Sequence, residues 1–292
     1  MSVEPSGVIP VRKPVGATSR RVVDVVARAL GTRSVGHAGT LDPLASGIVV
    51  VCVGRATRLV DQLHTLSKSY DATFLLGRSS PSDDLETPVS EEADPPRPEP
   101  AAVGAAAGRF HGEILQVPCT YSAVHVDGKR AYRLARKGRD VTLEPKRVRI
   151  DELRIVAYDW PRLDVAITCS TGTFVRALGR DLAAALGTTA VMTALDRTAV
   201  GPFIAESAIE LERIDAGTAA TALLPPLAAV AHLPRQALGG ERLEAAVRGR
   251  LLVLESESTT LAAVDEAGDL VGLLARHPSG TYRLRPNFRG LG

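Results

Sequence analysis

The sequence lacks any long hydrophobic run and has little cysteine. Its longest clean apolar stretch, Ile48–Val53, is far shorter than the roughly 20 residues that span a bilayer. The opening residues MSVEPSGVIPVRKP contain no apolar stretch of the kind found in a secretory signal. The three cysteines, Cys52, Cys119 and Cys169, are odd in number and far apart, which argues against a disulfide framework or a zinc knuckle. We therefore expect a cytoplasmic protein with reduced thiols.

Strong net charge and several catalytic motifs are also missing. The chain has 35 Lys and Arg against 33 Asp and Glu, a net charge of +2, so a nucleic-acid partner would have to be held by local basic patches. There is no GxSxG, no P-loop, no GxGxxG and no HExxH motif, which argues against the hydrolase, nucleotide and metalloprotease classes that these motifs define. The loop around Asp42 holds no second acid, so a paired-carboxylate hydrolase is poorly supported.

The most distinctive stretch that is present is Gly36–Gly47, GHAGTLDPLASG. A loop rich in Gly, Ser and Pro that precedes a β-branched run is typical of a shaped loop leading into a buried strand. Asp42 is then held on a rigid turn at the mouth of the core, where catalysis could use a fixed carboxylate. On this pattern alone Asp42 could equally be a turn former, because Asp before Pro is common in loops. His37 could be an ordinary loop histidine.

Helical and strand patterns alternate along the first 200 residues. A Lys13–Gly16 turn is followed by Thr18 or Ser19 as a helix cap. Tyr70 could be a core aromatic or a surface on which a base stacks. The periodicity predicts strands at 8–11, 48–53, 70–76 and 163–169, and helices at 22–30, 54–66, 101–110 and 175–186.

Two groups of cations suggest an anionic partner. Residues 129–139 carry many cations around Tyr132, which favours contact with a phosphate backbone over a merely solvated basic face. Arg176 begins a helix, where the helix dipole disfavours a cation. It therefore needs an anionic partner, either Asp42 or a nearby acid such as Asp181. The cations of the basic segment are Lys129, Arg130, Arg133, Arg136, Lys137 and Arg139.

The character of the chain changes after Leu224-Pro225-Pro226. Short strands separated by turns predict a small β domain, so we divide the chain into residues 1–224 and 225–292. The basic residues of the second part could contact RNA or simply keep the surface soluble. The predicted strands are Leu251–Leu254, Thr260–Val264, Leu270–Leu274 and Tyr282–Leu284.

The motif GHAGTLDPLASG closely resembles the signature of the TruB family of tRNA pseudouridine-55 synthases, and further segments resemble that family in the same order. They span residues 8 to 203. These segments are KPVGATS from Lys13, KSY from Lys68, QVP from Gln116 with YSA from Tyr121, GKRAY from Gly128, CSTGTFVR from Cys169 and LDRTAVG from Leu195.

The resemblance implies a mixed α/β (α+β) fold, with a largely antiparallel central sheet flanked by helices and a C-terminal PUA-like RNA-binding domain. It implies an isomerase that converts uridine to pseudouridine in the T loop of tRNA, without cofactor or metal, as a monomer with no obligate protein partner. Asp42 would be the catalytic aspartate, acting as nucleophile or as base, Tyr70 would stack on the target base, and Arg176 would pair with Asp42.

The resemblance also assigns residues around this centre. His37 would fill the space that the flipped nucleotide leaves, Lys13 would support the site, and Leu195 would line the uracil pocket. The tRNA T-arm would be bound in part by Lys129, Arg130 and Tyr132.

The sequence departs from the family pattern at several positions. Arg12 stands where the family commonly has Asp, Phe174 replaces a Tyr, and Asp196 interrupts an Arg-rich run; Cys119, His125 and Thr198 differ as well. Two other functions stay open: a non-catalytic RNA-binding protein on the same fold, and a synthase that depends on a guide RNA.

Overall fold

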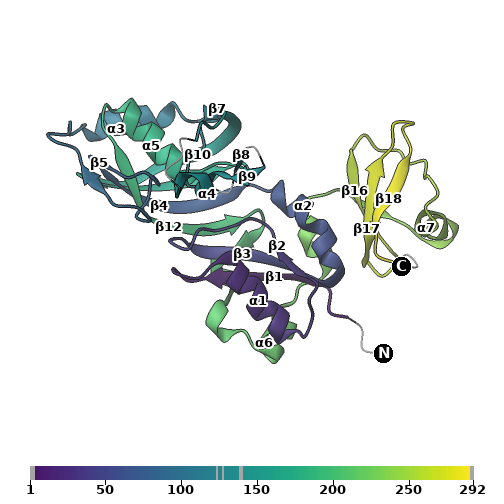
Figure 1. Ribbon diagram of the computed structural model, residues 1–292. Helices are drawn as coiled ribbons and strands as arrows, with labels where there is room; N and C mark the ends of the chain where they lie inside the picture. Colours follow the sequence, from purple (N-terminus) through teal and green to yellow (C-terminus); the bar gives the residue numbers. More distant parts are fainter. Residues whose placement is uncertain (1–3, 123, 127, 138–140, 290–292) are drawn as a thin grey trace.

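A large mixed sheet forms the framework of the molecule (Figure 1). The computed structural model describes residues 4–122, 124–126, 128–137 and 141–289. Within these residues the sheet has the order β14-β1-β3-β12-β4-β11-β10-β7, with β2 paired to β3 and β13 paired to β12. Its strands are β1 Gly7–Lys13, β2 Val35–His37, β3 Ser46–Val53, β4 Lys68–Leu76, β7 Gly112–Gln116, β10 Lys146–Asp159, β11 Arg162–Cys169, β12 Ala190–Val200, β13 Phe203–Ile204 and β14 Ile209–Glu210.

Most neighbouring strands are antiparallel, as expected from the sequence. The exceptions are β1 with β14 and β3 with β12, which are parallel. The contact between β3 and β12 joins the two halves of the sheet through Ser46 opposite Asp196 and Gly47 opposite Arg197. A Cβ atom on Gly47 would lie 2.3 Å from the carbonyl oxygen of Arg197, and the φ of Gly47 is +110°. Glycine is therefore required where the Asp42 loop enters the sheet.

One face of the sheet carries the larger core. The helices α1 (Ser19–Ala29) and α6 (Ala216–Ala222) cover the β1–β3 half, whereas α3 (Pro100–Gly108) and α5 (Val175–Ala185) cover the β4–β10 half. Figure 1 shows these two pairs at separate ends of the sheet. The loop that carries Asp42 reaches the same face, so the helices leave it room between them.

On the other face a second core covers β1, β3 and the end of β12. There the 3₁₀ segment η1 (Gly54–Leu59), the short helix α2 (Val60–His64) and the 3₁₀ turn η4 (Pro226–Val230) pack against Val8, Ile48 and Val50. Residues of the C-terminal sheet, including Leu273 and Phe288, belong to the same cluster. The second core therefore links the large sheet to the C-terminal part.

The C-terminal part is a small sheet with one helix. The strand order is β15-β16-β17-β18, from Arg235–Ala237, Thr260–Val264, Leu270–Arg276 and Tyr282–Asn287, and the helix α7 covers Gly240–Val247. The predicted strand Leu251–Leu254 is wrong, because Leu252 forms only an isolated bridge with Tyr282. The sequence prediction missed β15 and α7. The division at residue 224 remains a prediction.

Local signals in the sequence agree with the observed elements at several points. Thr18 caps α1, and its Oγ1 accepts a hydrogen bond from the backbone N–H of Arg21. The helix predicted for 54–66 is split into η1 and α2. In the basic segment the hairpin β8 (His125–Val126) and β9 (Lys129–Arg130) precedes a short helix α4 (Ala131–Ala135). Arg139 lies outside the described residues.

Two further short strands, β5 (Arg78–Ser79) and β6 (Ser90–Glu91), pair at the base of the polar loop between them. Two short 3₁₀ turns, η2 (Ala205–Ser207) and η3 (Leu211–Arg213), follow β12. In the part of the chain that the structure describes, no helix is both long and apolar enough to cross a membrane.

We predict that Gly179→Ala destabilises the fold by roughly 1–3 kcal/mol, the usual cost of overpacking. A Cβ atom at Gly179, in α5, would lie 2.0 Å from the ring of Phe74 in β4. Urea denaturation of the purified variant measures the change in the free energy of unfolding.

The matched control is Gly104→Ala in α3, where an added Cβ atom meets nothing within 4 Å. This variant should gain about 0.5–1 kcal/mol from the better helix propensity of alanine. Equal stabilities for the two variants would contradict the close packing of α5 on β4.

Candidate active site

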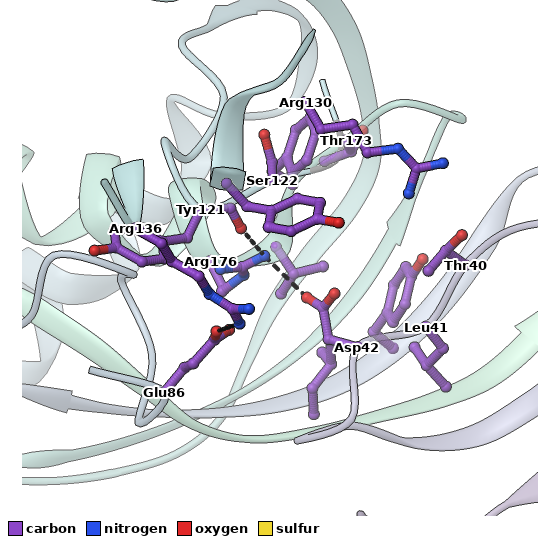
Figure 2. Close-up of a pocket in the computed structure, with 15 residues that line it drawn as sticks. Thr40, Leu41, Asp42, Glu86, Tyr121, Ser122, Arg130, Arg136, Thr173 and Arg176 are labelled. Atoms are coloured by element: carbon purple, nitrogen blue, oxygen red, sulfur yellow. Dashed lines mark hydrogen bonds and ion pairs between the residues drawn. The ribbon is translucent and has the colours of Figure 1, made fainter. Parts of the chain in front are cut away.

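A cavity of about 360 Å³ opens on the helix-covered face of the sheet. Four separate parts of the chain each contribute one of the predicted site residues to its wall: Asp42 from the loop between β2 and β3, Tyr70 from β4, Arg176 from α5 and Leu195 from β12. Figure 2 shows the Asp42 carboxylate pointing toward the guanidinium of Arg176. The structure thus brings together residues that lie more than 100 positions apart in the sequence.

Arg176 holds two carboxylates at once. Its Nη2 lies 3.0 Å from Oδ2 of Asp42, and its Nη1 lies 3.2 Å from Oδ2 of Asp84. The Arg176 side chain is 7% exposed, Asp84 is 3% exposed and Asp42 is 42% exposed. Burial disfavours the charged form of Arg176, but the Asp42 carboxylate and other acids more than offset this and raise its pKa. Asp42 is therefore both cation-bound and open to the cavity.

Backbone hydrogen bonds complete the support of Arg176. It donates to the carbonyl oxygens of Ser82, at 2.9 Å, and Tyr121, at 3.1 Å. The cation at the start of α5 is therefore stabilised by two acids and two carbonyl dipoles. This resolves the alternatives left by the sequence, because Asp181 pairs with Arg180 instead.

Buried side chains below the cavity fix the loop that carries Asp42. The Lys13 ammonium donates to the carbonyl oxygens of Pro14, Ala17 and Ala45. The Ser19 hydroxyl donates to the carbonyl oxygen of Leu41 and accepts from its N–H, at 3.0 and 2.8 Å. Burial lowers the pKa of Lys13 to about 8, although the nearby Asp42 charge opposes this.

Tyr70 and Leu195 form the floor of the cavity from adjacent strands. Leu195 lies opposite Ala72, two residues from Tyr70. Burial raises the pKa of the Tyr70 phenol, and the Arg197 cation opposes that rise. The phenol is therefore protonated at neutral pH and can donate a hydrogen bond or present its ring face to a ligand.

The rim of the cavity is basic and aromatic. Arg136 of the basic segment forms an ion pair with Glu86, and both residues line the cavity (Figure 2). The guanidinium of Arg136 also lies 5.5 Å from the centre of the Tyr132 ring. Arg130 lines the same rim. This edge can contact phosphate groups through Arg130 and Arg136 and a base through Tyr132.

The remaining predicted residues lie outside the cavity wall. Lys13 is fully buried beneath the loop, as described above. His37 ends β2, where burial and the Arg197 cation lower its pKa and keep its ring neutral. Its Nδ1 is buried and has no partner among the described residues. Lys129 lies in β9, but its side chain is outside what the structure describes.

The sequence analysis missed several residues of the site. Asp84 and Glu86 lie in the polar stretch between β5 and β6, where nothing in their spacing separates them from solvated surface acids. Tyr121 and Ser122 line the cavity from an irregular segment. Only the loop geometry that places Asp84 against Arg176 identifies it.

Two departures from the family pattern meet in space. A guanidinium nitrogen of Arg12 lies 3.4 Å from both carboxylate oxygens of Asp196, and the Ser46 hydroxyl donates to the same carboxylate at 2.5 Å. The unusual cation in β1 is therefore paired with the unusual anion in β12. Both residues directly precede a buried cation, Lys13 or Arg197.

Acids and sulfur or imidazole ligands do not converge on a metal site. Among the described residues, no group of three or more His, Cys, Asp or Glu side chains is arranged to hold a metal ion. The three cysteines are buried as free thiols. At the centre of the cavity wall the Asp42 carboxylate, the Tyr70 phenol and the Arg176 guanidinium are present together.

Comparison with solved structures gives the fold. The chain superimposes on a protein of a Cbf5-Nop10-Gar1 complex with a TM-score of 0.77 and 23% identity, covering 97% of this chain and 85% of that one. It matches a chain of an H/ACA RNP bound to a substrate RNA containing 2'-deoxyuridine with a TM-score of 0.73 and 22% identity, covering 97% and 84%. At these identities the likeness establishes the architecture alone.

Comparison of sequences gives the class of protein and then the family. Residues 27–175, half of the chain, match the N-terminal domain of a pseudouridylate synthase family. That family is TruB, and this chain belongs to it. The tRNA pseudouridine synthase B of Cutibacterium acnes is 41% identical over 94% of both chains, and that of Mycobacterium tuberculosis is 40% identical over 96% of this chain and 95% of the relative.

We predict that Arg176→Met destabilises the protein by roughly 3–5 kcal/mol, because it leaves the buried Asp84 carboxylate without its cation. Urea denaturation followed by circular dichroism measures the loss. The control is Arg20→Met, which removes an exposed ion pair with Asp24 and should change stability by less than about 1 kcal/mol. Similar small losses for both variants would contradict the buried role of Arg176.

Proposed function

We propose that this protein isomerises uridine to pseudouridine in the T loop of tRNA. The observation that carries the proposal is the Asp42 carboxylate, held at 3.0 Å by Arg176 in a cavity that Tyr70 and Leu195 also line. The relatives named tRNA pseudouridine synthase B, at about 40% identity over nearly the whole chain, support tRNA as the substrate.

The reaction requires the uracil ring to be detached, turned and rejoined. The N1–C1' bond breaks, a C5–C1' bond forms, the proton on C5 leaves and N1 gains a proton, so atoms and electrons balance without an oxidant or reductant. A group that attacks the sugar or removes a proton from it is needed, and we assign this role to Asp42, the cavity-lining carboxylate that Arg176 holds. The Arg176 cation forms an ion pair with that carboxylate at the cavity wall.

The cavity is sized for a nucleoside and not for a folded loop. The target uridine therefore has to leave its stack, at a cost of a few kcal/mol. In our proposal the Tyr70 ring and Leu195 then enclose the uracil, and the Tyr70 phenol assists proton transfer from C5. Excluding water from this space keeps the detached base from being lost to hydrolysis.

RNA would be held mainly through its backbone and shape. Arg130, Arg136 and Tyr132 at the rim are suited to the phosphates and bases of the distorted loop. We assign the catalytic machinery to residues 1–224 and further RNA contacts to residues 225–292. His37 and Lys129 belong to the same proposed RNA-binding set, and Lys13 supports the Asp42 loop from below.

We also propose that the protein acts alone on tRNA in the cytoplasm. The two rivals are an RNA binder without catalysis and a synthase that needs a guide RNA. The intact Asp42, Tyr70 and Arg176 favour an enzyme over a binder. Formation of pseudouridine on an unmodified tRNA transcript by the purified chain separates the stand-alone enzyme from both rivals.

We predict that Asp42→Asn abolishes tritium release from tRNA labelled at C5 of uridine, while binding of that tRNA is retained. The substitution keeps the shape of the side chain but removes the charge that Arg176 pairs with. Asp71→Asn is the matched control, since Asp71 is exposed and lies next to Tyr70 in β4. Full release by the Asp42 variant, or its loss in both, would contradict the assignment.

We predict that Arg130→Gln weakens tRNA binding. The slope of the logarithm of the association constant against the logarithm of salt concentration should become less steep by about 1, as expected when one phosphate contact is lost. A filter-binding series at increasing salt measures the slope. Arg154→Gln in β10 is the control, because Arg154 is exposed on strands away from the cavity rim. An unchanged slope for the Arg130 variant would show that Arg130 does not contact a phosphate group of the tRNA.

A further inference from the structure

Arg197 is an almost fully buried cation whose role the proposed chemistry leaves unexplained. It is 2% exposed and lies in β12 at the junction of the two halves of the sheet. It is opposite Gly47 of β3 on one side and opposite Tyr70 of β4 on the other. No ion pair of Arg197 with a carboxylate occurs among the described residues. It is not among the residues that line the cavity.

The Arg197 guanidinium bonds to backbone on both sides of Asp42. Its Nε donates to the carbonyl oxygen of Ile48 at 2.8 Å, and its Nη2 donates to that of Gly39 at 3.2 Å. A longer contact of 3.4 Å joins Nη1 to the carbonyl oxygen of Thr40. One planar side chain thus ties the strand after the loop to the residues two and three positions before Asp42.

The close approach of the backbone strengthens this connection. At Gly47 the two strands come so near that a Cβ atom would lie 2.4 Å from the backbone nitrogen of Arg197. The loop is therefore fixed at its end by Gly47 and across its body by the guanidinium. A shift of Arg197 would move the segment that carries Asp42.

The same cation acts on Tyr70. Burial raises the pKa of the phenol most strongly, and Arg197 is the cation that opposes it, whereas Cys169 and Asp42 act in the opposite direction. Burial is the main cause that lowers the pKa of Lys13 and of His37, and the Arg197 charge lowers both further. Its charge therefore reaches the groups on each side of the cavity floor.

A purely structural role does not explain this choice of side chain. Burying a charge that has no carboxylate partner costs several kcal/mol, and an apolar core residue of similar size avoids that cost. A lysine has a single nitrogen, which cannot repeat the fork of donors that meets separated carbonyls. The cost is understandable where geometry and charge at the site matter more than stability.

We propose that Arg197 is a positioning residue that does not contact the substrate. It fixes the position of the loop that carries Asp42, and its charge sets the electrostatic environment of the Tyr70 phenol. The proposal rests on the proposed function, because it names the support on which that site depends. The Arg197 guanidinium then joins the floor of the cavity to the loop that carries Asp42.

The test compares Arg197→Lys and Arg197→Met with the control Leu63→Ala, which opens the second core away from the cavity. Steady-state kinetics on tRNA should show kcat lowered about 100-fold in Arg197→Met, the usual effect of a small misplacement, with KM unchanged. Arg197→Lys keeps the charge but not the fork, so it should lose kcat as well. Leu63→Ala should lower the melting temperature and leave kcat unchanged.

A second measurement separates placement from stability. Fluorinated tyrosine is incorporated, and the ¹⁹F resonance of Tyr70 is assigned by its loss in Tyr70→Phe. The phenol should titrate at higher pH in Arg197→Met than in the wild type, and Arg197→Lys should stay near the wild type. A structural role alone predicts lower melting temperatures with unchanged kcat and unchanged titration, and that result overturns the proposal.

The outcomes also distinguish this inference from the proposed function. If the wild-type protein forms no pseudouridine in tRNA, the proposed function fails, while the ¹⁹F titration still tests the action of Arg197 on Tyr70. If Arg197→Met does not fold, Arg197→Lys carries the test through its kcat and its titration. Wild-type kcat in a folded Arg197→Lys variant then overturns the proposal.

Discussion

The site depends on one buried guanidinium shared by two carboxylates. Arg176 cannot be buried at the start of α5 without compensation, and Asp84 and Asp42 supply it. Because Asp84 is buried and Asp42 is partly open, the pair has unequal roles. Asp84 fixes the cation, and the cation then holds the Asp42 side chain at the cavity wall. Three segments that are distant in sequence become one unit through this interaction, so the fold and the site cannot be separated here.

A second constraint is that two cations, Lys13 and Arg197, are buried beneath the loop that carries Asp42. Lys13 and Arg197 are both buried and donate to carbonyl oxygens, and neither pairs with a carboxylate within the described part of the chain. The carbonyl oxygens accept hydrogen bonds from these two cations but do not neutralise their positive charge. Burial raises the pKa of the Tyr70 phenol, and the Arg197 charge opposes that rise without outweighing it. The same backbone contacts that shape the loop therefore also set its electrostatics.

Three residues that depart from the family pattern, Arg12, Asp196 and Phe174, are accommodated by contacts within the structure. Arg12 taken alone looks unfavourable, since it puts a second cation beside Lys13, and Asp196 puts an acid beside Arg197. In the structure they neutralise one another, with Ser46 as a third partner. Phe174 lacks the hydroxyl of the usual tyrosine, but its backbone still bonds to the side chain of Gln116 through both N–H and carbonyl. Phe174 lines the cavity together with Asp42, Tyr70 and Arg176.

The sequence by itself determined what depends on neighbours along the chain. The apolar run after Gly47 identified β3, Thr18 identified the start of α1, and the ordered motifs identified the family and its three central side chains. Tertiary structure alone decided what depends on contact between distant segments. Asp84 is an ordinary acid in a polar loop until Arg176 reaches it. Leu251–Leu254 is an apolar run typical of a strand, but it forms only an isolated bridge at Leu252. Side-chain periodicity reports which residues are buried, but the partner of a buried charge is set by the three-dimensional path of the chain.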